Sequence, residues 1–381
     1  MSVFNSLIDQ SQVVEILKEA ITSANNGNDQ NQAMTNTWLF TGPAGSGRSN
    51  AAIAFAAALV CKESGCSKCN DCISTILGTH ADVELIKTQG LSIKIDEVRE
   101  LISRASWAPS VASYRVVVIE DADRLTESAA NALLKVIEEP GLRTIWLLCA
   151  PTMTDVLPTI RSRCRHLALR TPSTRAITNL LIERDNVDAK TAEFFARASG
   201  GHIGRARRLA TDLTARQNRE NVLKLPLMIK DVASAFKAAQ FLIDSAKTDA
   251  LADAERKDED EILKLKEAWG TTGSKMASGG SKVIKELEKE QKARSTRMVR
   301  DYLDRALLDL ATLYRDIMLV QSNSTDSLIN QDLVEQINQL ASTSSQAKTL
   351  DRIEAILKTR RNLAQNAAPL LLIEALMCEL R

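Results

Sequence analysis

The stretch TGPAGSGRSN, residues 41–50, directly follows the apolar run WLF at residues 38–40. We expect the apolar run to form a buried strand and the decapeptide to turn through a glycine-rich loop into a helix. Gly42, Gly45 and Gly47 allow backbone N–H groups to close around a phosphate at the N-terminus of that helix, where the helix dipole also favours negative charge. The stretch therefore predicts an α/β fold organised around a phosphate-binding loop.

The loop departs from the pattern G-x-x-x-x-G-K-S/T at one fixed position, because Arg48 stands where the lysine should be. Ser49 fills the hydroxyl position, and the helix is expected to begin near it. A lysine ammonium on a thin stem reaches the β- and γ-phosphates, whereas arginine presents a wide planar fork. We therefore expect ATP or ADP with Mg²⁺ to bind weakly or without hydrolysis. The alternative is a glycine-rich turn that holds no ligand.

Length and composition set broad bounds on the protein. A chain of 381 residues favours two or three domains, and aromatic residues at only 4% with abundant Ala and Leu favour helices. The net charge of +1 gives no overall nucleic-acid footprint. The first residues lack the pattern of a secretion signal and no apolar run approaches about 18 residues. We expect a cytoplasmic protein with no membrane contact, whose seven cysteines are reduced thiols or metal ligands.

Four cysteines lie close together with the spacing C-x4-C-x2-C-x2-C: Cys61, Cys66, Cys69 and Cys72. Four thiolates this close in a cytosolic chain suit a tetrahedral zinc ion. With sulfur in all four positions no coordination site is left open for catalysis, so the predicted role is structural. The alternatives are reduced thiols on a loop and, less in keeping with the surrounding pattern, redox chemistry.

A buried strand at residues 114–119, YRVVVI, runs into Glu120 and Asp121. The C-terminal end of such a strand in a phosphate-loop protein is where a magnesium ligand and a carboxylate that orients the attacking water belong. The two acids are therefore candidate nucleotide-site residues. Their order, Glu before Asp, changes the reach of each side chain.

The other elements complete an α/β pattern. Further strands are expected at 82–86 and 144–150, and a polar turn at 25–32. Within 3–24 a short apolar segment at 3–8 is expected to lead into a helix, and further helices are expected at 95–104 and 126–139. Arg161, Arg163 and Arg165 follow the last strand, and such a run is usually a solvated surface. The order strand, phosphate loop, helix, strand, helix, strand with acids, helix, strand predicts a doubly wound nucleotide domain.

These residues resemble the clamp-loader branch of the AAA+ ATPases, and within it the delta-prime subunits of the bacterial DNA polymerase III clamp loader. The resemblance is carried by TGPAGSGRSN, by the cysteine module after the loop helix, by VVVIEDADRLTESAANALLKVIEEP and by LPTIRSRC. It covers residues 3 to about 212 well and continues more faintly to the C-terminal RRNLAQNAAPLLLIEALMCELR.

The resemblance implies a role for each matching position. Residues 42–49 match the Walker A loop, Glu120 and Asp121 the Walker B pair, and the four cysteines the family's zinc module, whose first spacing is usually longer. Arg163 matches the arginine finger of the Ser-Arg-Cys motif, which reaches into the ATP site of a neighbouring subunit and stabilises transition-state charge there.

Four departures fall in the chain's own nucleotide site, and none falls at the finger. Arg48 replaces the lysine, the Walker B acids are exchanged in type, Ala150 stands where motor subunits carry a polar residue, and Gly204 stands at the sensor arginine, with Arg205 one position late. This asymmetry predicts a stator, a subunit that serves a neighbour's site without turning over ATP. The three histidines, His80, His166 and His202, are expected to be structural.

Three domains follow from the resemblance and from the pattern of the C-terminal half. They are an AAA+ α/β domain at 1–170 with the zinc module at 61–72, a helical lid at 171–213, and an all-α collar at 214–381. Collar helices are expected at 226–246 with Pro226 in the first turn, at 252–269, at 282–320 and in two final helices, with a flexible loop at 270–281. The charged segment 252–300 is interpreted as a helical arm or insertion that packs on partner subunits. For residues 285–300, KELEKEQKARSTRMVR, nucleic-acid contact is the second interpretation.

The implied partners are clamp-loader motor subunits and the delta subunit in a heteropentamer, the sliding clamp, and primed DNA through the complex. The implied activity is to help load the clamp during replication, with no ATPase or polymerase activity expected of the chain alone. Two alternatives stay open: an active ATPase motor subunit of the same complex, and a non-catalytic adaptor that binds nucleotide.

Overall fold

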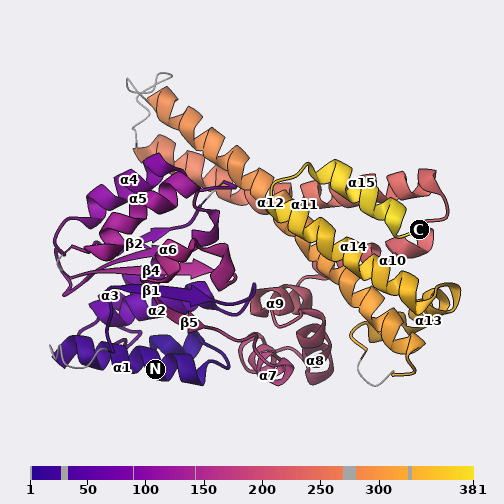
Figure 1. Cartoon of the computed structure of the whole chain (residues 1–381), viewed down its shortest axis with the longest axis horizontal. Helices are drawn as coiled ribbons and strands as arrows, with labels where there is room; N and C mark the ends of the chain where they lie inside the picture. The colour runs from indigo at the N-terminus through magenta and orange to yellow at the C-terminus, as the bar shows by residue number, and fades with distance from the viewer. Residues whose placement is uncertain (1, 27–32, 89, 142, 269–279, 325–327) are drawn as a thin grey trace. The chain divides into compact units, whose positions relative to one another are not determined.

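The computed structural model describes the chain apart from residues 1, 27–32, 89, 142, 269–279 and 325–327 (Figure 1). It divides into two compact units, one of residues 1–88 and 92–211 and one of residues 89–91 and 212–381. The predicted domain boundary at 213 lies close to this division. The predicted separation of 171–213 from 1–170 stays a prediction, because both segments fall in the first unit. Among the described residues no helix is long and apolar enough to cross a membrane.

The first unit contains a parallel five-stranded sheet with the order β2-β3-β4-β1-β5. The strands are β1 Thr37–Thr41, β2 Val83–Ile86, β3 Arg115–Ile119, β4 Thr144–Ala150 and β5 Arg165–Ala168. Every residue of the three central strands β1, β3 and β4 is buried, which explains why they are continuous apolar runs in the sequence. Four strands match the predicted ones. The edge strand β5 was not predicted, because its alternating burial and arginines looked like a surface run.

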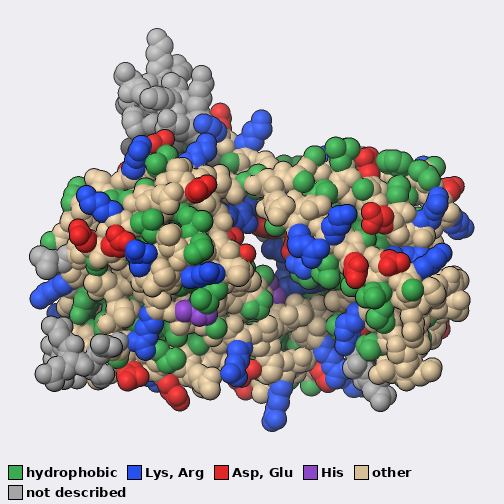
Figure 2. Space-filling view, in the orientation of Figure 1, with side chains coloured by type: hydrophobic (Ala, Val, Ile, Leu, Met, Phe, Trp, Pro, Cys, Tyr) green, Lys and Arg blue, Asp and Glu red, His purple; other side chains and the backbone are tan. Residues whose placement is uncertain are grey.

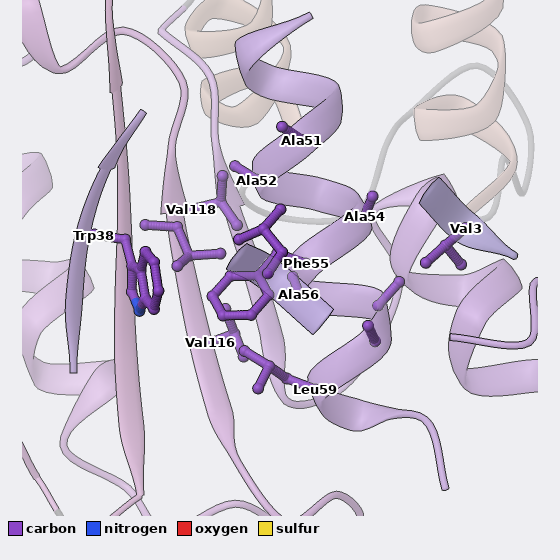
Figure 3. Packing of buried hydrophobic residues seen from close by; sticks show 14 of the residues in the cluster. Val3, Trp38, Ala51, Ala52, Ala54, Phe55, Ala56, Leu59, Val116 and Val118 are labelled. Atoms are coloured by element: carbon purple, nitrogen blue, oxygen red, sulfur yellow. The ribbon is translucent and has the colours of Figure 1, made fainter. Parts of the chain in front are cut away.

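Helices cover both faces of the sheet (Figure 1). They are η1 Val3–Ser6, α1 Ser11–Asn26, α2 Arg48–Val60, α3 Asn70–Leu77, α4 Ile95–Ala105, α5 Glu127–Glu138 and α6 Pro158–Arg161, with short 3₁₀ turns η2 Ala122–Arg124 and η3 Met153–Asp155. Phe55 of α2 packs edge-on against Trp38 of β1, 5.1 Å between ring centroids, beside Val116 and Val118 (Figure 3). Neighbouring strand residues such as Leu39 point to the opposite face, where α4 to α6 pack. The predicted α/β fold is thereby confirmed.

The first unit ends in three helices, α7 Thr174–Asp185, α8 Ala189–Ala198 and α9 Ile203–Thr211. Ser173 and Asp188 cap the first two through side-chain oxygens that accept from backbone N–H groups. Asp185 at the end of α7 accepts from Nε and Nη2 of Arg207 on α9 at 2.8 and 2.7 Å. This bidentate pair fixes α9 against α7.

The second unit is all-α. Its elements are α10 Leu213–Met228, α11 Val232–Ala268, α12 Gly280–Gln321, η4 Gln331–Leu333, α13 Val334–Thr343, α14 Gln346–Ala364 and α15 Pro369–Glu379. Asp316, fully buried on α12, accepts from the backbone N–H groups of Ile329 and Asn330 at 3.0 and 2.7 Å.

Figure 2 shows basic and acidic side chains interspersed over the visible face of the protein.

Several helix predictions for the C-terminal half were wrong. Pro226 lies in the last turn of α10 and does not begin a helix. The segments 226–246 and 252–269 were predicted as separate helices, but α11 runs unbroken from Val232 to Ala268, since no Gly or Pro interrupts it. In the described part of the chain, three α-helices follow α12, where two helices were expected. The predicted polar turn at 25–32 and the loop at 270–281 lie mostly outside the described residues.

Candidate nucleotide, zinc and arginine-finger sites

The phosphate loop connects β1 to α2. Gly45 and Gly47 have φ angles of 86° and 88°, in the left-handed region that favours glycine. A Cβ on Gly42 would lie 2.4 Å from the Oγ of Ser46, so the close approach of the loop to itself also requires glycine. Gly47 is the N-cap residue of α2, which begins at Arg48, one residue before the expected start. The sequence thus forms a glycine loop at a helix N-terminus, the arrangement that binds phosphates.

Arg48 points back across this loop. Its Nη1 donates a hydrogen bond of 2.7 Å to the carbonyl oxygen of Gly42, at the other end of the glycine stretch. Next to it, the Sγ of the buried Cys149 on β4 lies 3.8 Å from the carbonyl oxygen of Arg48. Burial raises the pKa of the Cys149 thiol, so this side chain stays neutral beside the loop.

Three acids follow β3 at the same edge of the sheet. The carboxylate of Glu120 lies 3.5 Å from the Nζ of Lys87, which follows β2, and Asp121 is buried. Asp123 has one carboxylate oxygen that is buried with no hydrogen-bond partner among the described residues. Burial, and then the charge of Asp121, raises the pKa of Asp123. The charges of Arg48, Glu120, Asp121 and Asp123 all act on the pKa of the Cys149 thiol, so these groups lie in its neighbourhood.

The end of α8 and the start of α9 approach the phosphate loop. A Cβ on Gly45 would lie 2.5 Å from the Cα and Cγ of His202, so the histidine packs directly on the loop backbone. The Nδ1 of His202 accepts from the backbone N–H of Arg205 at 3.2 Å. Gly204 lies on the first turn of α9, and Ala150 is buried at the end of β4. His202 therefore has a packing role next to the candidate nucleotide site.

The four cysteines converge. Their sulfur atoms all lie within 4.8 Å of one another, and Cys61 Sγ is 3.8 Å from Cys66 Sγ and 3.6 Å from Cys69 Sγ. A tetrahedral zinc ion with Zn–S bonds of about 2.3 Å holds its sulfur ligands about 3.8 Å apart. Backbone N–H groups of Cys69 and Cys72 donate to the sulfur atoms of Cys66 and Cys69, each at 3.4 Å. These residues fit a structural zinc site.

The surroundings of Cys61 and of Cys72 have opposite effects on the pKa of the two thiols. Burial raises the pKa of the Cys61 thiol, but the backbone N–H groups of Cys66, Gly65 and Glu63 outweigh it and bring the pKa to about 7. Burial raises the pKa of Cys72. The backbone around Cys61 therefore favours its thiolate, and a bound Zn²⁺ would supply positive charge that favours the thiolate of Cys72.

Arg163 lies two residues after α6, on the surface. Its Nη1 donates to the carbonyl oxygen of Thr159 at 2.8 Å and to the Oγ of Ser162 at 3.3 Å, and its Nη2 lies 2.5 Å from Oε1 of Glu138. Its side chain is 40% exposed, so a neighbouring molecule can reach it. Arg165 has a different place: it is on β5, with its guanidinium 4.8 Å from the ring centre of Trp38.

Comparisons with known proteins match this chain to DNA polymerase III subunits. The family model described as "DNA polymerase III, delta subunit" matches residues 12–173, and "DNA polymerase III, delta subunit, C terminal" matches residues 298–381. DNA polymerase III subunit delta' of Bacillus subtilis is 28% identical over 336 residues, which are 87% of this chain and 87% of that protein. The chain is similar to DNA polymerase III delta and delta' subunits over most of its length, and these similarities support a clamp-loader role. The resemblance found in the sequence is confirmed.

Other members of the family match over shorter stretches. Subunit delta' of Pseudomonas aeruginosa is 30% identical over 210 residues, 53% of this chain and 64% of that protein. Subunit gamma/tau of Mycobacterium tuberculosis is 33% identical over 178 residues, 44% of this chain and 31% of that protein. The chain is thus similar to both delta' and gamma/tau subunits, and it spans about one third of the gamma/tau relative's length.

Two solved structures are similar over most of this chain, with low scores. A gamma subunit-related protein of Thermotoga maritima has a TM-score of 0.36 at 16% identity, covering 90% of this chain and 99% of that one. The Bacillus subtilis clamp loader delta protein has a TM-score of 0.31 at 12% identity, covering 97% and 99%.

Sequence reasoning missed three residues of these sites: Lys87, Asp123 and Glu138. The run EDAD after β3 signals a third acid, so Asp123 was within reach of the sequence. Lys87 and Glu138 had no such signal, because each meets its partner only through the order of strands and helices. Lys87 is far from its partner Glu120 in the sequence, and Glu138 is far from its partner Arg163.

Proposed function

We propose that this clamp-loader chain acts as a delta-prime subunit, a stator that supplies Arg163 to the ATP site of a neighbouring subunit. The observation that carries the proposal is the contrast between its two candidate sites. In its own nucleotide site the arginine at the lysine position binds the loop carbonyl of Gly42, and Glu120 is paired with Lys87. At the finger position, Arg163 is exposed on a fixed turn.

In the chain's own site, the cation and the candidate carboxylate that hydrolysis would use are engaged with other partners. A Walker A lysine neutralises charge on the β- and γ-phosphates, and an unpaired carboxylate orients the attacking water. Here the cation is held by a backbone carbonyl, and the candidate carboxylate Glu120 lies 3.5 Å from an ammonium group. ATP or ADP with Mg²⁺ bound at Gly42, Gly45, Gly47, Arg48, Ser49 and Asp121 would then persist without turnover.

The proposed partners follow from the family. Gamma/tau and delta subunits are the members with which a delta-prime chain would form a heteropentamer, and that complex would load the sliding clamp onto primed DNA in the cytoplasm. In this proposal residues 1–170, 171–213 and 214–381 are the AAA+ domain, the lid and the collar. Zinc held by the four cysteines would stabilise the AAA+ domain.

The test is ATP hydrolysis by a reconstituted loader that contains the Arg163→Ala chain. An arginine finger contributes about 10³-fold or more to the rate, so we expect about that loss at the one site that depends on this chain. Arg161→Ala, which removes an arginine two residues earlier, is the matched control and should leave the rate unchanged. An unaltered rate with Arg163→Ala would rule out the finger assignment.

Motor and adaptor functions predict different results. A motor subunit would hydrolyse ATP as an isolated chain, and an adaptor would support clamp loading equally well with Arg163→Ala. Of the two, the motor has a specific observation in its favour, the intact glycine geometry of the loop.

A further inference from the structure

The turn that carries Arg163 is fixed at the backbone. Ile160 of α6 is fully buried against the sheet, and its carbonyl oxygen accepts from the backbone N–H of Arg163 at 3.0 Å. The Sγ of Cys164 donates to the same carbonyl at 3.1 Å. Burial raises the pKa of this thiol to about 12, so Cys164 packs as a neutral side chain. The backbone at Arg163 therefore cannot shift without disturbing the core.

Its guanidinium is held from two elements. Thr159 and Ser162, on the same turn, accept from Nη1, while Glu138, the last residue of α5, accepts from Nη2 at 2.5 Å. A guanidinium has five N–H donors. These contacts account for both hydrogens of Nη1 and one of Nη2, which leaves Nε–H and a second Nη2–H for the oxygens of a phosphate.

An acidic side chain at the position of Glu138 destabilises helix α5 when the helix is considered alone. The C-terminal end of a helix carries partial negative charge, which disfavours an acidic side chain and favours a cation. Glu138 lies in this last turn and Glu139 follows it as the C-cap. The same negative end of α5 that disfavours Glu138 attracts the guanidinium, so helix dipole and carboxylate act together on Arg163.

We propose that Glu138 is a positioning residue that orients the arginine finger before the neighbouring subunit binds ATP. This inference rests on the proposed function of Arg163. A free arginine side chain loses rotamer freedom when it engages a phosphate, and a side chain already held in one geometry loses less. Because the two side chains are 40% and 48% exposed, their contact is modest in strength and can coexist with a phosphate on the remaining donors.

The experiment compares steady-state ATPase kinetics of reconstituted loaders that carry Glu138→Gln, Arg163→Ala, or both. Glu139→Gln, the adjacent exposed acid, is the matched control. We expect Glu138→Gln to lower kcat at the dependent site about two- to fivefold, the size of an exposed ion pair, with KM for ATP unchanged. Glu138→Gln should have no further effect when Arg163 is already alanine, and thermal unfolding should be unchanged.

The outcomes separate the inference from the proposed function. If Arg163→Ala leaves the rate unchanged, the finger assignment fails and Glu138 has no finger to orient. If Arg163→Ala lowers the rate but Glu138→Gln matches the wild type or raises kcat, the finger stands and the positioning role is wrong. An equal loss with Glu139→Gln would also overturn the inference, since the effect would then be general to acidic charge at this helix end.

Discussion

Asp82→Asn should destabilise the first unit, because Asp82 organises the loop before β3. Asp82 is 1% exposed and directly precedes β2. Its carboxylate accepts from the backbone N–H groups of Ser110, Val111 and Ala112 at 2.7, 2.7 and 2.8 Å, and from the Oγ of Ser110 at 2.9 Å. Asparagine keeps one oxygen, loses the charge and turns an NH₂ group toward these donors.

The magnitude follows from the pKa of Asp82. Burial raises this pKa, but the three backbone N–H groups and the Ser110 hydroxyl outweigh burial and lower it from 3.8 to about 2. A shift of about two pH units corresponds to about 2.5 kcal/mol of folding free energy from the charged carboxylate. Because the folded pKa lies below the unfolded one, this contribution is complete above about pH 5 and is lost as the pH falls toward 2. At pH 3 about 1 kcal/mol of it is already gone.

The assay is unfolding of the full chain followed by tryptophan fluorescence, since Trp38 and Trp146 are buried in the sheet of the first unit. We expect Asp82→Asn to lower the Tm by about 5–10 °C at pH 7, and the gap to the wild type to narrow by about 1 kcal/mol at pH 3. Asp96→Asn, whose side chain is 86% exposed, is the control. A loss below about 0.5 kcal/mol at pH 7, or a gap that does not change with pH, would refute the reasoning.

Two further predictions concern the zinc and nucleotide sites. Elemental analysis should find one zinc ion per wild-type chain, and Cys69→Ser should abolish zinc binding and lower the Tm of the protein. Cys378→Ser, outside the cluster, is the control and should change neither the zinc content nor the Tm. Zinc retained by the Cys69→Ser protein would contradict the four-sulfur site. Arg48→Lys should leave the isolated chain without measurable ATP hydrolysis, because Glu120 remains paired with Lys87, and turnover by either form would favour the motor function.

Predictions from the sequence were most reliable where one local pattern fixes one local structure. Continuous apolar runs identified β1, β3 and β4, since strands buried on both faces have no polar positions. The helix predicted at 126–139 matches α5, and Thr126 caps it, since its Oγ1 accepts from the backbone N–H of Ala129 at 3.3 Å. Helix limits in the second unit were less predictable, because Pro226 is tolerated in a last turn as well as a first.

The sequence by itself determined the glycine loop, the cysteine cluster and the surface arginine, because each depends on backbone geometry between residues close in the chain. Tertiary structure decided what the charged side chains do. Strand order places Lys87 beside Glu120, and packing of α6 against the sheet places Arg163 beside Glu138. Long, flexible side chains take their partners from whichever elements the core brings within a few ångströms, and that is a property of the whole fold.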